Sequence, residues 1–222
     1  MITNPHMRIP SQHTGPALEA DGPVAVLIHG RSQSSRDMLD VAKRLDLPQM
    51  PIVAVDAADN SWYPYPFMEP VAHNEPSLGY SLERLDRLIS ELNASGIPND
   101  RIAIVGFSQG ACLACEYVFR KHQPFAALVA YTGGLIGPDG MQWQPAGCLE
   151  GMRVFLSNGD QDPWVPVERT KETLNVFKAL GADTEFRVYP GRSHEICDDE
   201  IMASRALLQR ALHLTTEHEN PR

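Results

Sequence analysis

The chain has 222 residues, of which 43% are hydrophobic and 21% are charged, and its formal net charge is −9. This length and composition suit one folded domain over residues 1–222 and exclude wholesale disorder. The acidic balance argues against nucleic acid or an anionic membrane as the main partner. The sequence shows neither an apolar run of roughly 18 residues, as a membrane span needs, nor the apolar core of a secretory signal, so we expect a cytoplasmic protein.

Predicted strands and helices alternate along the chain. Continuous apolar runs predict strands buried on both faces, and apolar residues three and four positions apart predict amphipathic helices. The strands are predicted at 24–30, 51–57, 101–107, 125–133, 153–159 and 184–190, the last with the alternation of a strand near a sheet edge. The helices are predicted at 34–45, 81–96, 108–122, 167–181 and 198–214. This order predicts an α/β fold with a mostly parallel sheet and helices on both faces.

Two long segments, residues 58–77 and 133–151, fit no regular element. The first holds four prolines and four aromatic residues, and aromatic side chains argue against disorder. Both segments follow strands, and parallel sheets bind ligands outside the carboxyl ends of their strands, so both are expected to rim that end. The aromatic loop either lines a substrate pocket or simply packs onto the sheet. The candidates for the pocket wall are Trp62, Tyr63, Tyr65, Phe67 and Met68, with Trp164 from a later loop.

The stretch Gly-Phe-Ser-Gln-Gly at residues 106–110 joins a predicted strand directly to a predicted helix. A Gly-x-Ser-x-Gly pattern alone is a weak signal, but between a strand and a helix it is typical of a nucleophile elbow. Gly106 and Gly110 let the two elements approach closely, and the serine lies at the positive end of the helix. The sequence therefore predicts Ser108 as a nucleophile rather than an ordinary helix cap.

A serine nucleophile needs a base, and the base needs an orienting acid. In such folds the acid and then the histidine follow the serine, on loops after late strands. Asp160 and Asp162 follow the strand at 153–159, and His194 follows the strand at 184–190. We predict Asp162 as the acid, His194 as the base and Asp160 as a turn residue. The alternative is that Asp162 is only a solvated turn residue and His194 an incidental loop histidine.

Acyl transfer also needs hydrogen-bond donors for the oxyanion. One predicted donor is the backbone N–H of Gln109, the residue after the nucleophile. The other is the N–H of Arg31, in the loop after the strand at 24–30. His29 is expected to hold this loop by hydrogen bonds, and His122 is expected to end a helix. The histidines expected at solvated or terminal positions are His6, His13, His73, His213 and His218, with a substrate contact as an alternative for His73.

Cys112 and Cys115 form a Cys-x-x-Cys pair inside a predicted helix. We expect both to be small buried core residues with reduced thiols. The sequence offers no second cysteine pair and no histidine cluster to complete a zinc site. It therefore predicts no metal.

Several motifs together resemble the phospholipase/carboxylesterase family of small α/β-hydrolases, which includes acyl-protein thioesterases and bacterial carboxylesterases. They are LIHGRSQS, SWYPY, GFSQGACLA, GDQDPWVP and GRSHEIC, in family order from residue 24 to the C-terminus. The resemblance implies an α/β-hydrolase fold without a large cap domain, Ser108, Asp162 and His194 as a triad, no cofactor, and hydrolysis of carboxylic esters or thioesters. A looser resemblance is to dienelactone hydrolases, which use Cys in place of Ser108. The chain departs from the family at Ser32, usually glycine, and in its unusual 58–77 loop.

We expect a serine esterase that cleaves a small-molecule ester through an acyl-enzyme intermediate. The bulky stretch from Trp62 to Met68 favours short to medium acyl chains, about two to eight carbons. The alternatives are an acyl-protein or acyl-CoA thioesterase or a lysophospholipase with the same triad, a peptidase, or a non-catalytic binding protein on this fold. A homodimer is an open alternative to a monomer.

Overall fold

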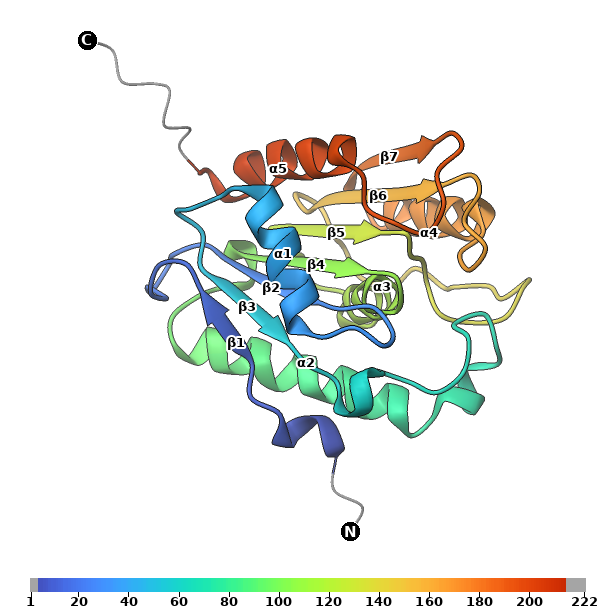
Figure 1. Cartoon of the computed structure of the whole chain (residues 1–222), viewed down its shortest axis with the longest axis horizontal. Coiled ribbons are helices and arrows are strands. Elements are labelled where there is room, and N and C mark those ends of the chain that lie inside the picture. Colours follow the sequence, from blue (N-terminus) through green and yellow to red (C-terminus); the bar gives the residue numbers. More distant parts are fainter. Residues whose placement is uncertain (1–3, 215–222) are drawn as a thin grey trace.

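A seven-stranded sheet in the order β1-β3-β2-β4-β5-β6-β7 forms the centre of the computed structural model, which describes residues 4–214 (Figure 1). Strands β2 to β7 are parallel, and the short β1 pairs antiparallel with β3 at one edge. The strands are β1 (Gln12–Thr14), β2 (Val24–Ile28), β3 (Ile52–Val55), β4 (Ile102–Phe107), β5 (Ala127–Tyr131), β6 (Arg153–Gly159) and β7 (Asp183–Tyr189). The predicted mostly parallel α/β sheet is confirmed, with β7 at the other edge.

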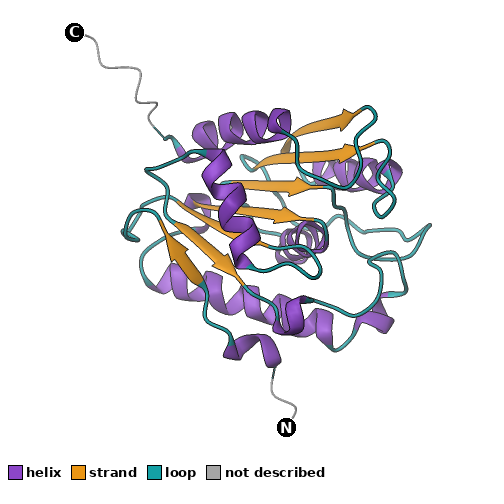
Figure 2. Cartoon of the chain, in the orientation of Figure 1, coloured by secondary structure: helices purple, strands orange, loops and turns teal. Residues whose placement is uncertain are grey.

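Helices cover both faces of the sheet, as buried parallel strands require (Figures 1 and 2). α1 and α5 pack on one face around one apolar cluster, and α2, α3 and α4 pack on the other around a second. None of the helices in the described part of the chain is long and apolar enough to cross a membrane. The helices are α1 (Ser35–Leu45), α2 (Ser77–Ala94), α3 (Gln109–Lys121), α4 (Val167–Ala179) and α5 (Asp198–Leu212).

Helix α2 begins at Ser77, earlier than the predicted start at residue 81. Its first turn contains Gly79, which reads as a loop residue in the sequence. The Glu75 carboxylate accepts the N–H of Gly79 at 2.9 Å and so satisfies a donor that the helix itself leaves free. The preceding aromatic loop is also more ordered than predicted, since it contains two short 3₁₀ helices, Ala58–Asn60 and Val71–Asn74.

The prediction that His6 is solvated is wrong. His6 lies in a 3₁₀ helix, Pro5–Arg8, and is only 3% exposed. Its Nδ1 accepts the N–H of Ala58 at 2.9 Å, so its Nε2 carries the proton that faces the Ser81 hydroxyl at 3.1 Å. These partners lie far away in the sequence, which explains why local patterning misses them. His13 is exposed in β1 and His213 caps α5, whereas His218 lies outside the described residues.

Candidate active site

Ser108 lies at the turn between β4 and α3 with φ 54° and ψ −120°. This conformation is strained for any residue other than glycine and is held by its surroundings. A Cβ atom at position 106 would lie 2.5 Å from the Gly110 carbonyl oxygen, and one at position 110 would lie 2.2 Å from the Ile28 carbonyl oxygen. The two glycines therefore permit the tight strand–turn–helix packing that presents the serine at the carboxyl end of the sheet.

Ser108, His194 and Asp162 form a continuous chain of hydrogen bonds. The Ser108 Oγ lies 2.7 Å from the His194 Nε2, and the His194 Nδ1 lies 2.7 Å from the Asp162 Oδ2. An ionised carboxylate only accepts, so Nδ1 carries the proton and Nε2 is left to accept the serine proton. The other Asp162 oxygen accepts the N–H groups of Trp164 at 2.8 Å and Val165 at 3.0 Å. The geometry thus orients the imidazole for proton transfer from Ser108.

The two aspartates after β6 have different surroundings. Burial would raise the pKa of Asp162, but hydrogen bonds from His194 and the two backbone N–H groups outweigh it and hold that pKa below its usual value. Asp160 instead accepts the N–H of Gly191 at 2.7 Å and so joins the β6 loop to the His194 loop. Asp162 therefore stays ionised beside the imidazole, and Asp160 shapes the turn, as predicted.

The His194 loop has a second support that the sequence did not suggest. Arg192, which is 7% exposed, donates to the Glu195 carbonyl and to the fully buried Glu200 carboxylate. Glu200 also accepts the N–H of Cys197 at 2.8 Å at the start of α5. This buried ion pair fixes the loop that carries His194.

The loop after β2 abuts the nucleophile, since a Cβ on Gly30 would lie 3.2 Å from the Ser108 Cβ. The His29 Nε2 accepts the N–H of Ala57 at 3.0 Å, so Nδ1 carries the proton and donates to the Gly30 carbonyl at 2.7 Å. The prediction that His29 holds this loop is confirmed. Ser32 has φ 62°, in the left-handed region that favours glycine, which explains why the resembled family usually has glycine there.

Arg31 and Gln109, the two predicted oxyanion donors, line the same cavity as Ser108 and come from two elements. Arg31 belongs to the loop after β2, and Gln109 is the first residue of α3. Within residues 4–214, neither N–H donates to a protein acceptor. Gln109 lies at a helix N-terminus, where the first N–H groups are left free, and Arg31 lies in a turn.

A cavity of about 480 Å³ opens over Ser108 and His194. Three of the predicted wall residues line it, namely Tyr63, Phe67 and Trp164. Trp62, Tyr65 and Met68 do not. The residues that sequence reasoning missed include Cys112, one helical turn after Ser108, and Val165, three residues after Asp162. The full lining is Arg31, Ser32, Tyr63, Pro64, Pro66, Phe67, Ser108, Gln109, Cys112, Trp164, Val165 and His194.

Comparison with known proteins settles the family. Residues 22–212 match the family model described as Phospholipase/Carboxylesterase. The chain belongs to the phospholipase/carboxylesterase family. The resemblance predicted from the motifs is therefore confirmed, and it extends over most of the chain.

Proteins similar to this family member include a phospholipase/carboxylesterase and an acyl-protein thioesterase. A solved phospholipase/carboxylesterase from Dyadobacter fermentans is 38% identical, with a TM-score of 0.84 over 90% of this chain and 96% of that chain. Acyl-protein thioesterase 1 from Mycosarcoma maydis is 28% identical over 86% of this chain and 92% of that protein. The carboxylesterase of Bacillus cereus shares the fold, with a TM-score of 0.72 over 90% of this chain and 94% of that chain. It is 20% identical to this chain. The predicted α/β-hydrolase fold is confirmed.

The stretch of residues 61–67, here called the aromatic segment, is held in this family member by α3. The Gln109 side chain accepts the N–H of Trp62 at 3.0 Å and donates to the Tyr63 carbonyl at 2.7 Å. Trp62 is fully buried, and its Nε1 donates to the His29 carbonyl at 2.8 Å. Trp62 therefore supports the loop after β2 from below, which is why it does not reach the cavity.

The outer side of the aromatic segment is held by Arg31. Its guanidinium donates to the Pro64 carbonyl at 2.8 Å and to the Tyr65 carbonyl at 3.0 Å. Tyr65 points away from the cavity and is 53% exposed, and its N–H donates to Asn74 at 2.9 Å. The guanidinium thus clamps the segment, and Arg31 also lines the cavity.

The second long loop, residues 133–151, supports the site without lining the cavity. The buried Arg169 of α4 donates to the carbonyls of Leu135 at 3.1 Å and Gly137 at 2.6 Å. The N–H of Gly137 in turn donates to the Phe67 carbonyl at 2.9 Å. This loop therefore backs the aromatic segment, although the sequence suggested that both loops rim the site alike.

Proposed function

We propose that the protein is a serine esterase that cleaves carboxylic esters of short to medium acyl chain. The observation that carries the proposal is the hydrogen-bonded chain from Ser108 through His194 to Asp162, on a strained turn beneath an open cavity. Nucleophile, base and orienting acid lie in this order in serine hydrolases. Membership of the phospholipase/carboxylesterase family supports the same chemistry.

In this mechanism the Ser108 Oγ attacks the ester carbonyl while His194 takes its proton. Asp162 holds the imidazole in the required tautomer and stabilises the imidazolium. The N–H groups of Arg31 and Gln109 bind the oxyanion of the tetrahedral intermediate. His194 then returns the proton to the leaving alcohol, and water releases the acyl group by the same steps.

The cavity suggests the size of the acyl group. At about 480 Å³ it is in the lower part of the range for small-molecule sites. Tyr63, Phe67, Cys112 and Val165 supply apolar and aromatic wall beside Ser108. We therefore expect acyl chains of about two to eight carbons to fit best.

A thioesterase is the second candidate, because the Mycosarcoma maydis relative is named an acyl-protein thioesterase. The same nucleophile, base and oxyanion donors would serve a thioester. Faster hydrolysis of palmitoyl than of butyryl thioesters would favour this candidate over ours. We also propose that the chain is a single domain, since all seven strands share one sheet. The cytoplasmic location and the homodimer remain predictions.

The proposal is tested by labelling with a fluorophosphonate probe, which reacts with activated serines. We expect one label on the wild type and none on Ser108→Ala, with a loss of ester hydrolysis of at least about 10³-fold. Ser32→Gly is the matched control, because Ser32 lines the same cavity and glycine suits its φ. Ser108→Ala protein that is still labelled, or still hydrolyses esters at wild-type rate, contradicts the assignment.

A series of nitrophenyl esters from about two to sixteen carbons tests the chain length separately. We expect kcat/KM to peak at or below eight carbons and to fall beyond it. A peak at sixteen carbons would overturn the size argument while leaving the serine mechanism intact.

A further inference from the structure

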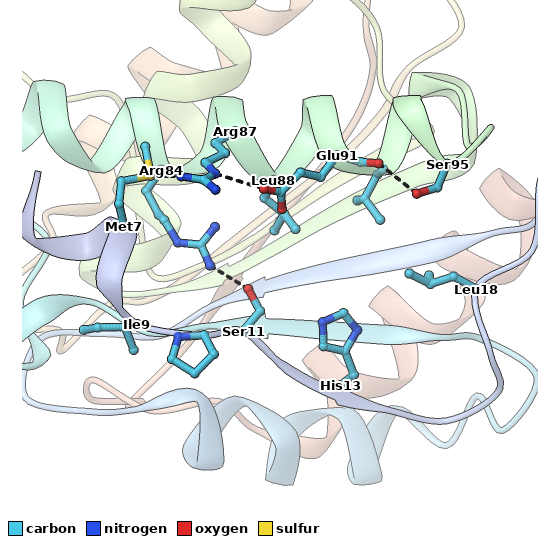
Figure 3. Close-up of a pocket in the computed structure, with 12 residues that line it drawn as sticks. Met7, Ile9, Ser11, His13, Leu18, Arg84, Arg87, Leu88, Glu91 and Ser95 are labelled. Carbon is cyan, nitrogen blue, oxygen red and sulfur yellow. Dashed lines mark hydrogen bonds and ion pairs between the residues drawn. The ribbon is translucent and has the colours of Figure 1, made fainter.

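A second cavity, of about 350 Å³, lies at the β1 edge of the sheet (Figure 3). One wall is α2, and the other is the chain between residues 7 and 18 that leads into and out of β1. It shares no lining residue with the cavity over Ser108. We call it the edge groove. Any ligand that it takes would occupy a site separate from the proposed active site.

Arg84 is the unusual residue of the edge groove. It lies on α2, is only 6% exposed, and reaches across to the N-terminal segment, where Nη2 donates to the Ser11 hydroxyl at 2.6 Å (Figure 3). Its Nε has no hydrogen-bond partner, and within residues 4–214 no carboxylate forms an ion pair with it. Burial lowers the pKa of the guanidinium. A buried cation without a paired anion is costly in a folded protein, so this arginine lacks the partner that such groups normally have.

The neighbouring charges do not supply that partner. Glu91 is the carboxylate in the lining, and its Oε1 accepts from the Nε of Arg87 at 2.9 Å. Glu91 also attracts the charge of Arg84, but within residues 4–214 it forms its ion pair with Arg87 and not with Arg84. The His13 side chain also points into the groove (Figure 3). The part of the groove beside Arg84 is therefore suited to one anionic group.

Apolar side chains line the groove beside Arg84 on both walls. Leu88 and Leu92 follow Arg84 along α2, and Met7, Ile9 and Leu18 face them from the N-terminal segment. Leu88 and Leu92 are buried, while the three residues opposite are half-buried. A ligand that fills this space needs an alkyl part beside its anionic group.

We propose that the edge groove binds a small aliphatic carboxylate, with its carboxylate on Arg84 and its alkyl chain between Leu88, Leu92 and Leu18. The planar guanidinium offers paired N–H donors that match the two oxygens of a carboxylate. A bare phosphate would satisfy the charge but leave the apolar walls unfilled. This inference does not depend on the proposed esterase function, because it concerns a different cavity.

The test is a titration of hexanoate into ¹⁵N-labelled protein, followed by NMR. We expect saturable shifts at Ser11 and His13, and affinity for acetate lower by at least about tenfold, since each buried methylene adds to binding. Arg84→Met should weaken hexanoate binding by at least about tenfold, whereas Arg36→Met, which removes the same charge from an exposed site on α1, should not. Hexylammonium should not bind.

Three results would overturn the proposal. The first is that Arg84→Met binds hexanoate as tightly as wild type does. The second is that the wild type binds inorganic phosphate as tightly as hexanoate. The third is that hexanoate shifts only the NMR signals of residues around Ser108. Without ligand, Arg84→Met should melt no lower than wild type, because methionine removes an unpaired buried charge. A lower melting temperature together with unchanged hexanoate binding would mean that Arg84 is purely structural. If Arg84→Met does not fold, Leu18→Trp serves instead, since it keeps the arginine and should abolish binding by filling the groove.

Discussion

Two neighbouring parts of the molecule, the Ser108–His194–Asp162 group and the aromatic segment, lie at the carboxyl end of the sheet but are held differently. Each of the three side chains follows a strand within a short turn, so the strand ends position it. The aromatic segment lies well beyond its strand and is held by side chains from other elements, mainly Arg31 and Gln109. Changes in the first group should therefore affect the chemical step, and changes in the second should affect which substrate fits.

Among the changes that compare these two regions, Asp162→Asn should have the largest effect. Asparagine can donate to the imidazole and favour the wrong tautomer, so kcat should fall by roughly 10³–10⁴-fold with a small change in KM. Asp160→Asn is the matched control, and it should lose less than about tenfold because Asp160 only accepts from Gly191. Steady-state kinetics on a nitrophenyl ester decides between them. A larger loss in the Asp160 variant would mean that the wrong acid has been assigned.

Arg31 belongs to both regions, so two substitutions at one position can separate them. Arg31→Pro removes the backbone N–H that we propose as an oxyanion donor and should lower kcat by about 10²–10³-fold. Arg31→Ala keeps that N–H and removes only the clamp on the carbonyls of Pro64 and Tyr65. It should lower kcat/KM by about three- to tenfold, equally for neutral and acidic esters, because the guanidinium donors are engaged with the loop.

Equal rates for the two variants would exclude the Arg31 N–H from the oxyanion site. A loss confined to carboxylate-bearing esters in Arg31→Ala would instead assign the side chain to substrate recognition. Circular dichroism of both variants controls for misfolding, since proline also restricts the preceding residue.

A change in the cavity wall should alter selectivity rather than the chemical step. Phe67 lines the cavity and is 8% exposed. Phe67→Ala enlarges the acyl space, so the kcat/KM ratio of octanoyl to butyryl ester should rise by about tenfold. Phe119→Ala, on α3 outside the cavity lining, is the control and should leave that ratio unchanged. An unchanged ratio in Phe67→Ala would show that the acyl chain lies elsewhere.

The smallest effect concerns stability around Trp62, the buried residue of the aromatic segment. The centroid of its ring lies 5.6 Å from that of His6 and 5.0 Å from that of His29. Burial lowers the pKa of both histidines, and in His6 the charge of Arg84 adds to this. The unfolded chain takes up these protons near pH 6.5, above the folded pKa values. Their contribution to stability is therefore complete above about pH 6.5 and is lost as pH falls toward the folded values.

Melting temperatures between about pH 8 and pH 5 measure this effect. The wild type should lose a few degrees more over that range than His6→Gln, which has no group to protonate there. The exposed His73→Gln is the control and should keep the wild-type slope. Parallel curves for wild type and His6→Gln would contradict the assignment of a neutral buried imidazole.

Local patterns are sufficient to predict the six parallel strands, the elbow at Ser108 and the placement of Asp162 and His194 after late strands, but they miss the short antiparallel β1. Each depends on residues a few positions apart, so a single sequence carries the signal. The family match confirms the fold that these patterns predict.

What local patterns do not reveal depends on contacts between distant parts of the chain. The burial of His6 requires Ala58 and Ser81, and the inward position of Trp62 requires the His29 carbonyl. Polar contacts of this kind have no period along the sequence. The same reason applies to the 133–151 loop, which looks like the aromatic loop in sequence. Its hydrogen bonds to Arg169 of α4 hold it outside the cavity lining, and the sequence alone does not show these bonds.

The position of Trp164 has a practical consequence for optical measurements. The chain has three tryptophans, and Trp164 is 72% exposed at the mouth of the cavity, whereas Trp62 is fully buried beside the loop after β2. Acrylamide should quench the fluorescence of Trp164 first, and a ligand that enters the cavity should shield it from the quencher. The protein thus contains its own fluorophore for following substrate entry in real time, with the emission of Trp62 as an internal reference.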